Sequence, residues 1–279
     1  MQIVTDSGTD VGLEAQECQE LGVHIVPLQV TLDGRSYQEG IDITPEDPYR
    51  QLAESGSLPA TSQPAPGVFA ALYRRLASVD RDILSVHMSS GLSGTVNAAL
   101  NGAAMVPEAH VTVVDTKTLS AAAGWQVEAA ARAARAGWSL EAILDLLHRI
   151  GEASSTFFTL NDLRYLIHGG RISHIKGLLA QLLNIKPVIG VDKVRGIYEQ
   201  RGQARTFQGA LRALVQLVAD EYAEGNALRV QVVHALNPEG ARQLHEAIAS
   251  RLSAEFLPDA VLSVVLGAHP GPTMVGAAS

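Results

Sequence analysis

The chain has 279 residues, of which 47% are hydrophobic and 18% are charged, and its formal net charge is -8. This apolar content excludes a disordered chain, and the length favours two compact domains of about 140 residues each, with one large domain as the alternative. The acidic balance, without a Lys/Arg block, argues against a nucleic-acid binder, whose surface would be basic. Aromatic residues supply only 5%, so the apolar surplus is mostly aliphatic.

The cysteine content and the length of the apolar runs bear on the cellular location of the protein. Cys18 is the single cysteine and cannot form an intrachain disulfide, and no residue spacing suggests a metal site. No apolar run approaches the roughly 18 to 20 residues of a membrane span, and the first ten residues lack the layout of a secretory signal. We therefore expect a cytoplasmic protein without a transmembrane segment.

In the first half of the chain, short β-branched runs alternate with helical patterns, which indicates βαβ units around a mostly parallel sheet. The expected strands cover residues 2–5, 25–32, 83–88 and 111–114. Apolar residues at helical spacing predict helices over 67–77, 94–105 and 120–135. Another helix follows Ser139, whose hydroxyl suits the N-cap position.

A small polar stretch at residues 151–155 separates this pattern from a different one, and we place a domain boundary there, giving domains 1–150 and 151–279. The second half predicts helices over 161–167, 177–183, 206–223 and 238–252, and strands over 156–160, 187–191, 196–200, 228–235 and 261–266. A short connector joins strands 187–191 and 196–200, so a hairpin is expected. The sequence therefore predicts an α/β protein with a second, α+β domain that contains antiparallel pairing.

Small polar residues follow three first-half strands, and such strand ends meet at one edge of an α/β sheet, where ligands bind. The most informative segment is 89–95, in which Gly91 and Gly94 would let the backbone approach a ligand closely. Ser93 and Thr95 add hydroxyl groups beside a helix N-terminus, an arrangement that suits a carboxylate or phosphate. An ordinary helix cap at Ser93 or Thr95 is an equally good interpretation.

Four other polar positions each have a structural alternative. Thr61 lies in a proline-bounded loop and could serve only as a capping hydroxyl. Arg171 follows two glycines that could simply end a helix, and Arg205 precedes a predicted helix, where an arginine is usually surface. His269 follows a predicted strand, where a structural histidine is the default and a ligand-facing one the alternative.

Common enzyme templates do not match. The sequence lacks a dinucleotide-binding glycine motif, a phosphate-binding P-loop and a zinc-protease motif. Residues 91–94 approach a nucleophile elbow, but Thr95 stands where that motif has glycine. A serine hydrolase acting through Ser93, with His87 or His269 as its base, is the alternative enzyme hypothesis.

Taken in order and spacing, the motifs of this chain resemble those of DegV family proteins over essentially its whole length. They are Ile3-Val4-Thr5-Asp6-Ser7, Val26-Pro27-Leu28, Gly40-Ile41-Asp42-Ile43, Thr61-Ser62-Gln63-Pro64, Ser90-Gly91-Leu92-Ser93-Gly94-Thr95, Val114-Asp115-Thr116-Lys117, Gly169-Gly170-Arg171-Ile172 and Lys186-Pro187. The resemblance implies a two-domain bacterial protein that binds a long-chain, palmitate-like fatty acid and has no complete active site or cofactor. It further implies the acyl-carrying subunit of a fatty acid kinase system, which presents the carboxylate to a separate ATP-binding kinase.

The same resemblance assigns roles to individual residues. It implies that Thr61 and Ser93 hold the carboxylate, with His269 beside it, and that Arg171 and Arg205 lie on a kinase-docking face. Elementary energetics agree, because each buried CH2 group of a ligand contributes roughly 0.8 kcal/mol, so an aliphatic tunnel would dominate affinity. Neutral hydroxyl donors would then satisfy the carboxylate without fixing it in an ion pair.

Overall fold

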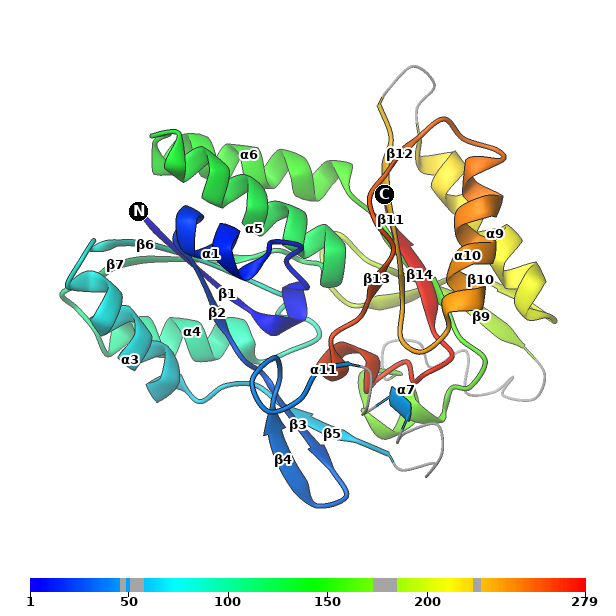
Figure 1. Cartoon of the computed structure of the whole chain (residues 1–279), viewed down its shortest axis with the longest axis horizontal. Coiled ribbons are helices and arrows are strands. Elements are labelled where there is room, and N and C mark those ends of the chain that lie inside the picture. Colours follow the sequence, from blue (N-terminus) through cyan, green and yellow to red (C-terminus); the bar gives the residue numbers. More distant parts are fainter. Residues whose placement is uncertain (46–48, 51–57, 173–184, 223–226) are drawn as a thin grey trace.

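The computed structural model describes residues 1–45, 49–50, 58–172, 185–222 and 227–279. Three sheets organise these residues (Figure 1), and the helix expected over 177–183 lies outside them. The first sheet is parallel and has the strand order β2-β1-β6-β7. Its strands are β1 (Gln2–Asp6), β2 (Val23–Val26), β6 (Asp82–His87) and β7 (His110–Asp115).

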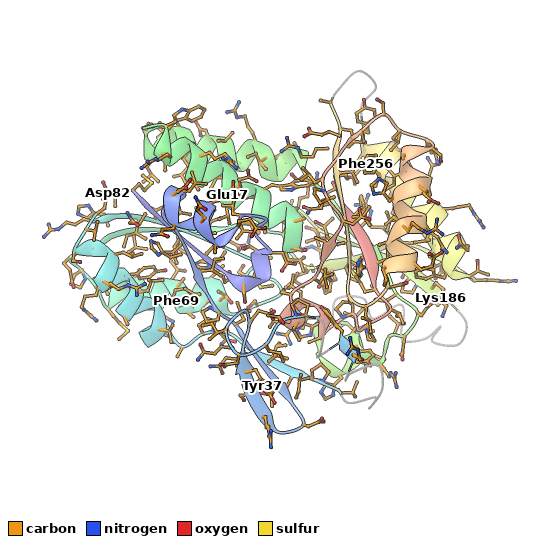
Figure 2. All side chains as sticks on the ribbon, viewed as in Figure 1. Glu17, Tyr37, Phe69, Asp82, Lys186 and Phe256 are labelled. Carbon is orange, nitrogen blue, oxygen red and sulfur yellow. The ribbon has the colours of Figure 1, made fainter. Side chains whose placement is uncertain are left out.

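Helices cover both faces of the parallel sheet, which is why its strands are apolar on both sides. Ile3 of β1 packs with one pair of helices and the next residue, Val4, with the other pair, because successive side chains of a strand point to opposite faces. Phe69, labelled in Figure 2, packs in the second of these layers. The helices are α5 (Ser120–Arg135) and α6 (Leu140–Ala153) on one face, α3 (Pro66–Ala77) and α4 (Thr95–Ala104) on the other, with α1 (Ala15–Leu21) beside β2.

The second sheet is mostly antiparallel and has the order β10-β9-β8-β14-β11-β12, with β13 pairing β11. Phe157 faces the outer helices α9 and α10, whereas Phe158 faces the centre of the molecule. The elements are β8 (Thr156–Thr159), α7 (Arg164–His168), β9 (Lys186–Val191), β10 (Tyr198–Ala204), α9 (Phe207–Glu221), β11 (Arg229–His234), α10 (Pro238–Ala249), β12 (Glu255–Phe256), β13 (Ala260–Val261) and β14 (Val275–Ala278).

A small antiparallel sheet, in the order β4-β3-β5, projects from the lower edge of the molecule in Figure 1. It consists of β3 (Gln29–Leu32), β4 (Arg35–Gln38), which carries the labelled Tyr37 of Figure 2, and β5 (Ala60–Ser62). Two short elements connect it to the rest, the 3-10 turn η1 (Ser7–Thr9) and the helical turn α11 (Val264–Gly267). Buried residues of all three sheets meet in one central core, which includes Val30, Phe158 and Ile189.

The α/β class, the parallel first sheet and the hairpin of β9 and β10 are confirmed, as is the N-cap at Ser139, whose hydroxyl accepts the Ala142 N–H at 3.3 Å. Two predicted strands are wrong. Residues 25–32 form two strands of different sheets, separated at Pro27, which has no N–H to donate. Residues 261–266 end β13 and enter α11, and the C-terminal strand is β14 instead. We keep the domain boundary after residue 150 as a proposal, because the second sheet begins at β8.

Candidate functional site

Four residues singled out in the sequence line one small cavity, which we call the donor cavity. They are Thr61, Ser93, Arg171 and His269. The cavity has a volume of about 20 Å³, enough for roughly one water molecule and far too small for a long chain. Arg205 is not among its lining residues and lies exposed just before α9.

Thr61 and His269 come from opposite ends of the chain and form a hydrogen bond. The Thr61 Oγ1 to His269 Nε2 distance is 3.0 Å. Burial, together with the nearby Arg171 and His168, lowers the pKa of His269 to about 3, so its imidazole is neutral at ordinary pH. Its Nδ1 atom is buried without a partner in the described residues. We therefore assign the ring hydrogen to Nε2, which donates it to Thr61, because a hydrogen on Nδ1 would be an unpaired donor.

Ser93 lies in the loop between β6 and α4. Its Oγ is 2.8 Å from Thr95 Oγ1 and accepts the Thr95 backbone N–H at 3.3 Å. Thr95 itself is fully buried. The N-cap of α4 is Gly94 and has no side-chain capping bond, so the predicted cap at Ser93 or Thr95 is wrong; Ser93 precedes the N-cap and bonds only the first N–H of the helix. Ser93 also borders the donor cavity.

Arg171 brings a positive charge to the cavity. Its Nε donates to Leu92 O at 3.3 Å and its Nη1 to Gly169 O at 2.7 Å, so the side chain joins the loop before α4 to the end of α7. Burial lowers the pKa of the guanidinium, with a small opposing effect from Tyr198, but the group stays charged at ordinary pH. Among the described residues it forms no ion pair, so its charge is free to attract an anion.

The remaining wall of the donor cavity is largely apolar. Gln63 and Ser62 are at the polar side. Six lining residues also belong to the central core: Leu28, Met88, Leu92, Tyr198, Val265 and Leu266. Sequence reasoning did not single out Tyr198, since nothing in its local sequence marks it. A polar head in the cavity would therefore touch the aliphatic interior directly.

The prediction that Gly91 lets the backbone approach a ligand closely is wrong. A side chain at this position would meet Gly196 O at 2.6 Å and Arg195 O at 2.7 Å, so the missing side chain admits the turn between β9 and β10, not a ligand. Ser89 Oγ donates to Gly196 O at 2.7 Å, and Gly196 itself has a φ of 66°, which favours glycine. This contact joins the first sheet to the second beside the donor cavity.

A separate hydrogen-bonded chain connects helix α3 to strands β6 and β1 of the first sheet, and we call it the sealed network. Tyr73 Oη is 2.7 Å from Ser85 Oγ, which is 2.7 Å from His87 Nε2, and His87 Nδ1 is 2.8 Å from Asp6 Oδ2. All four side chains are fully buried. His87 uses both ring nitrogens here and so cannot be a base for Ser93, whose bonds go to Thr95. The hydrogen bond that a serine hydrolase requires is not made between Ser93 and either candidate histidine.

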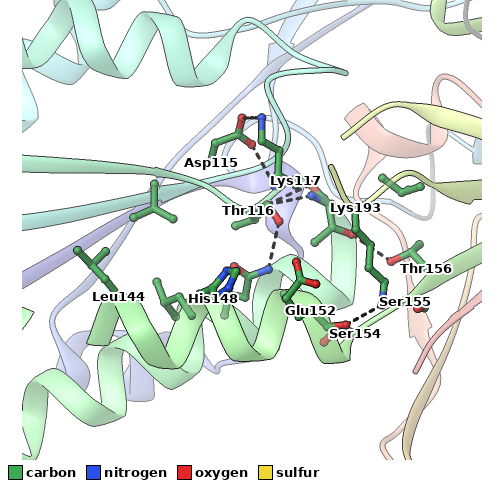
Figure 3. Close-up of a pocket in the computed structure, with 16 residues that line it drawn as sticks. Asp115, Thr116, Lys117, Leu144, His148, Glu152, Ser154, Ser155, Thr156 and Lys193 are labelled. Carbon is green, nitrogen blue, oxygen red and sulfur yellow. Dashed lines mark hydrogen bonds and ion pairs between the residues drawn. The ribbon is translucent and has the colours of Figure 1, made fainter. Parts of the chain in front are cut away.

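A larger cavity of about 240 Å³ lies where α6 and β7 meet the second sheet (Figure 3). Its lining includes Asp115, Thr116 and Lys117 of one family motif but none of Thr61, Ser93, Arg171, Arg205 and His269. Both of its lysines already have partners: Lys117 Nζ lies 2.9 Å from Asp115 Oδ2, and Lys193 Nζ donates to the backbone carbonyl of Glu152 at 2.8 Å. We therefore take the donor cavity, whose cation forms no ion pair among the described residues and whose other wall is apolar, as the candidate site.

Fold and site together define an α/β protein in which hydroxyl, imidazole and guanidinium groups face a cavity backed by aliphatic residues. A family model described as "Uncharacterised protein, DegV family" matches residues 1–279. The chain therefore belongs to the DegV family, as its motifs indicated. A DegV domain-containing protein of Deinococcus radiodurans is 36% identical over 271 residues, with 97% of this chain and 93% of the relative covered.

Solved structures of the family have the same fold. A DegV family protein from Thermus thermophilus, described by its fatty acid binding, is 35% identical with a TM-score of 0.89 and covers 99% of this chain and 98% of its own. A protein from Eubacterium ventriosum, described as stearic acid-binding, is 25% identical with a TM-score of 0.90 and covers 100% and 97%. Members of this family thus bind fatty acids.

In the described part of this chain, none of the helices has the length and apolar character needed to cross a membrane.

Proposed function

We propose that this protein binds a long-chain fatty acid, holds its carboxylate at Thr61 and Ser93, and acts as a cytoplasmic carrier without a catalytic site of its own. The observation that carries the proposal is that these hydroxyls, Arg171 and His269 border one cavity whose other wall belongs to the central core. The related structures described as fatty acid-binding support the ligand class.

The hydrogen-bond directions suit a carboxylate. Because His269 Nε2 donates to Thr61 Oγ1, the Thr61 hydroxyl hydrogen is free to be donated to the ligand. Thr95 can donate to Ser93 Oγ in the same way, which leaves the Ser93 hydrogen for a second ligand bond. Such chains polarise one another, so neutral donors can hold a charged group. The uncompensated Arg171 adds long-range attraction without a direct ion pair.

The acyl chain would occupy the central core beyond this cavity. The donor cavity alone is too small for it, so core side chains must move when the ligand enters. Met88 and Met274, both in this core, are suited to such movement because their unbranched side chains adapt readily. A chain of 16 carbons buried there at roughly 0.8 kcal/mol per CH2 would supply most of the affinity.

The test is a double substitution, Thr61→Ala with Ser93→Ala, followed by mass spectrometry of an organic extract and by titration with palmitate. Hydrogen bonds to charged groups are worth about 1.5 to 3 kcal/mol each, so affinity should fall by about 100-fold or more. A matched control is Thr31→Ala with Ser36→Ala, an exposed hydroxyl pair 2.9 Å apart on the same small sheet as Thr61. Unchanged fatty-acid retention in the first variant would refute the proposal.

We further propose that the bound carboxylate is presented to a separate ATP-binding kinase, which docks beside Arg171 and Arg205. Arg205 is exposed and has no ion pair within the described chain, which leaves it available to a partner. Arg205→Ala should slow ATP-dependent acyl phosphate formation by the kinase while leaving palmitate affinity unchanged. Arg212→Ala, on α9, is the control, and equal rates in all three proteins would contradict the docking role.

A further inference from the structure

The hydroxyl of Tyr198 is the unexplained polar group of the donor cavity. Tyr198 begins β10, is 5% exposed and packs its ring edge-on against Phe158, with ring centroids 5.2 Å apart. It borders the donor cavity, yet within the described residues its hydroxyl makes no hydrogen bond. By contrast, the hydroxyls of two other buried tyrosines are hydrogen-bonded: that of Tyr73 to Ser85, and that of Tyr49, which donates to Ser263 O at 2.8 Å.

The Tyr198 side chain is mostly buried, but its hydroxyl is not among the fully buried, partnerless side-chain atoms of the described residues, which are Trp125 Nε1, Ser263 Oγ and His269 Nδ1. The hydroxyl therefore keeps some accessible surface, where a water molecule or a ligand can supply the hydrogen bond that polar groups normally make. Burial raises the pKa of Tyr198, with a smaller opposite effect from Arg171, so the phenol keeps its proton and remains a donor. A donor beside a cavity that has no partner among the described residues is available to a ligand.

We propose that the Tyr198 hydroxyl donates a hydrogen bond to the carboxylate of the bound fatty acid, as a third donor beside Thr61 and Ser93. This inference rests on the proposed function and extends it. Each sheet then contributes one donor: Thr61 from the small sheet, Ser93 from the loop after β6 of the parallel sheet, and Tyr198 from the second sheet.

The position of Tyr198 also gives it a role in specificity. Tyr198 belongs to the central core and also lines the cavity, so the residue stands where the head group would meet the acyl chain. Hydrogen bonds to a charged acceptor are about twice as strong as those to a neutral one. Tyr198 therefore favours a free acid over an ester with the same chain, and it sets the depth at which the head group stops.

The experiment compares palmitate with methyl palmitate in the wild type, in Tyr198→Phe and in the control Tyr73→Phe, which also loses one buried hydroxyl. Tyr198→Phe should weaken palmitate binding about tenfold and methyl palmitate binding less than twofold, whereas Tyr73→Phe should leave the ratio of the two affinities unchanged. The carboxyl resonance of bound [1-13C]palmitate should move in Tyr198→Phe only.

A wild-type measurement covers the case in which Tyr198→Phe does not fold. With [ζ-13C]tyrosine in the wild-type protein, the Tyr198 resonance should move more on adding palmitate than on adding methyl palmitate. An unchanged affinity ratio in a folded Tyr198→Phe protein, or equal resonance shifts with both ligands, would overturn the inference while palmitate binding upholds the proposed function. Failure of the wild type to bind palmitate would overturn both.

Discussion

The sealed network and the donor cavity contain the same kinds of residue but differ in how completely their hydrogen bonds are satisfied. In the sealed network His87 bonds through both ring nitrogens, and Tyr73 bonds to Ser85. In the donor cavity one nitrogen of His269 has no partner in the described chain, and neither has the Tyr198 hydroxyl. The first region is closed to solvent, and the second borders a cavity.

This difference shows that residue types do not by themselves mark a functional site. Ser85, His87 and Asp6 have the order of contacts found in a serine protease triad, but no substrate could reach them. Their bonds hold β6 to the end of β1, since Asp6 also accepts the backbone N–H groups of Met88 and Gly8. Satisfied groups are structural here, and unsatisfied groups beside a cavity indicate ligand binding.

The largest effect is expected from breaking the sealed network with His87→Ala. This change leaves the Asp6 carboxylate and the Ser85 hydroxyl buried without their main partner, which should lower the free energy of unfolding by about 3 to 5 kcal/mol. Urea denaturation measures it. His110→Ala is the control, since this exposed histidine pairs with Asp82 at 3.0 Å and should cost less than about 1 kcal/mol. Equal losses in the two variants would remove the distinction between the regions.

Two largely buried carboxylates, Asp10 and Glu39, form a third polar region, whose stability should depend on pH. Asp10 Oδ1 accepts the Ser263 N–H at 3.2 Å, and Glu39 accepts the N–H groups of Val264 and Val265 at 3.0 and 2.7 Å. The two carboxylates thereby hold the start of α11, and neither forms an ion pair among the described residues. Burial raises the pKa of Asp10 to about 6 and that of Glu39 to about 7, with a smaller upward effect of Asp6 on Asp10 and of Asp10 on Glu39.

These two pKa values predict a pH-dependent stability that is of intermediate size for each group. Because both are raised in the folded state, their contribution is fully present below about pH 4 and is lost as the pH rises through 6 to 7, by at most roughly 3 kcal/mol per group. Asp10→Asn with Glu39→Gln should therefore flatten the free energy of unfolding between pH 5 and pH 8, measured by urea denaturation. Glu246→Gln, at an exposed ion pair, is the control. Parallel profiles for the double variant and the wild type would show that these carboxyls do not titrate in that range.

The smallest effect comes from removing one hydroxyl from each region in the ligand-free protein. Tyr73→Phe should lower the free energy of unfolding by about 1 kcal/mol, because it deletes a satisfied hydrogen bond. Tyr198→Phe should change it by less than about 0.5 kcal/mol, because its hydroxyl has no bond to lose. Thermal and urea unfolding of delipidated protein would check this, and an equal loss at Tyr198 would mean that its hydroxyl is satisfied after all.

Much of the fold could be predicted from the sequence because its signals are local. The strands β1 and β6 each contain short β-branched or aliphatic runs, Ile3-Val4 and Ile83-Leu84, and Ser139 has the right chemistry directly before a periodic segment. Strands with weak sequence signals were not predicted, for physical reasons. The strand β14 consists of Val275, glycine and two alanines, which carry little strand preference, and β4 is largely exposed. The apolar run at 261–266 fits a buried helical turn as well as a strand.

The candidate site was predictable only in part. Thr61, Ser93, Arg171 and His269 were chosen through the family resemblance, and the structure brings all four to one cavity, although their ligand-binding role stays a prediction. Tyr198 could not have been found, because the absence of a hydrogen-bond partner exists only in three dimensions. The ligand role predicted for Gly91 was wrong because the backbone that approaches it belongs to a turn about 100 residues away in the sequence, a contact that only the structure shows.

The bond between Thr61 and His269 spans 208 positions of the chain. If Thr61 and His269 flank the head group as proposed, a chain truncated before residue 269 lacks one of the two side chains that make this bond. Such a truncated chain should then retain less fatty acid than the full chain.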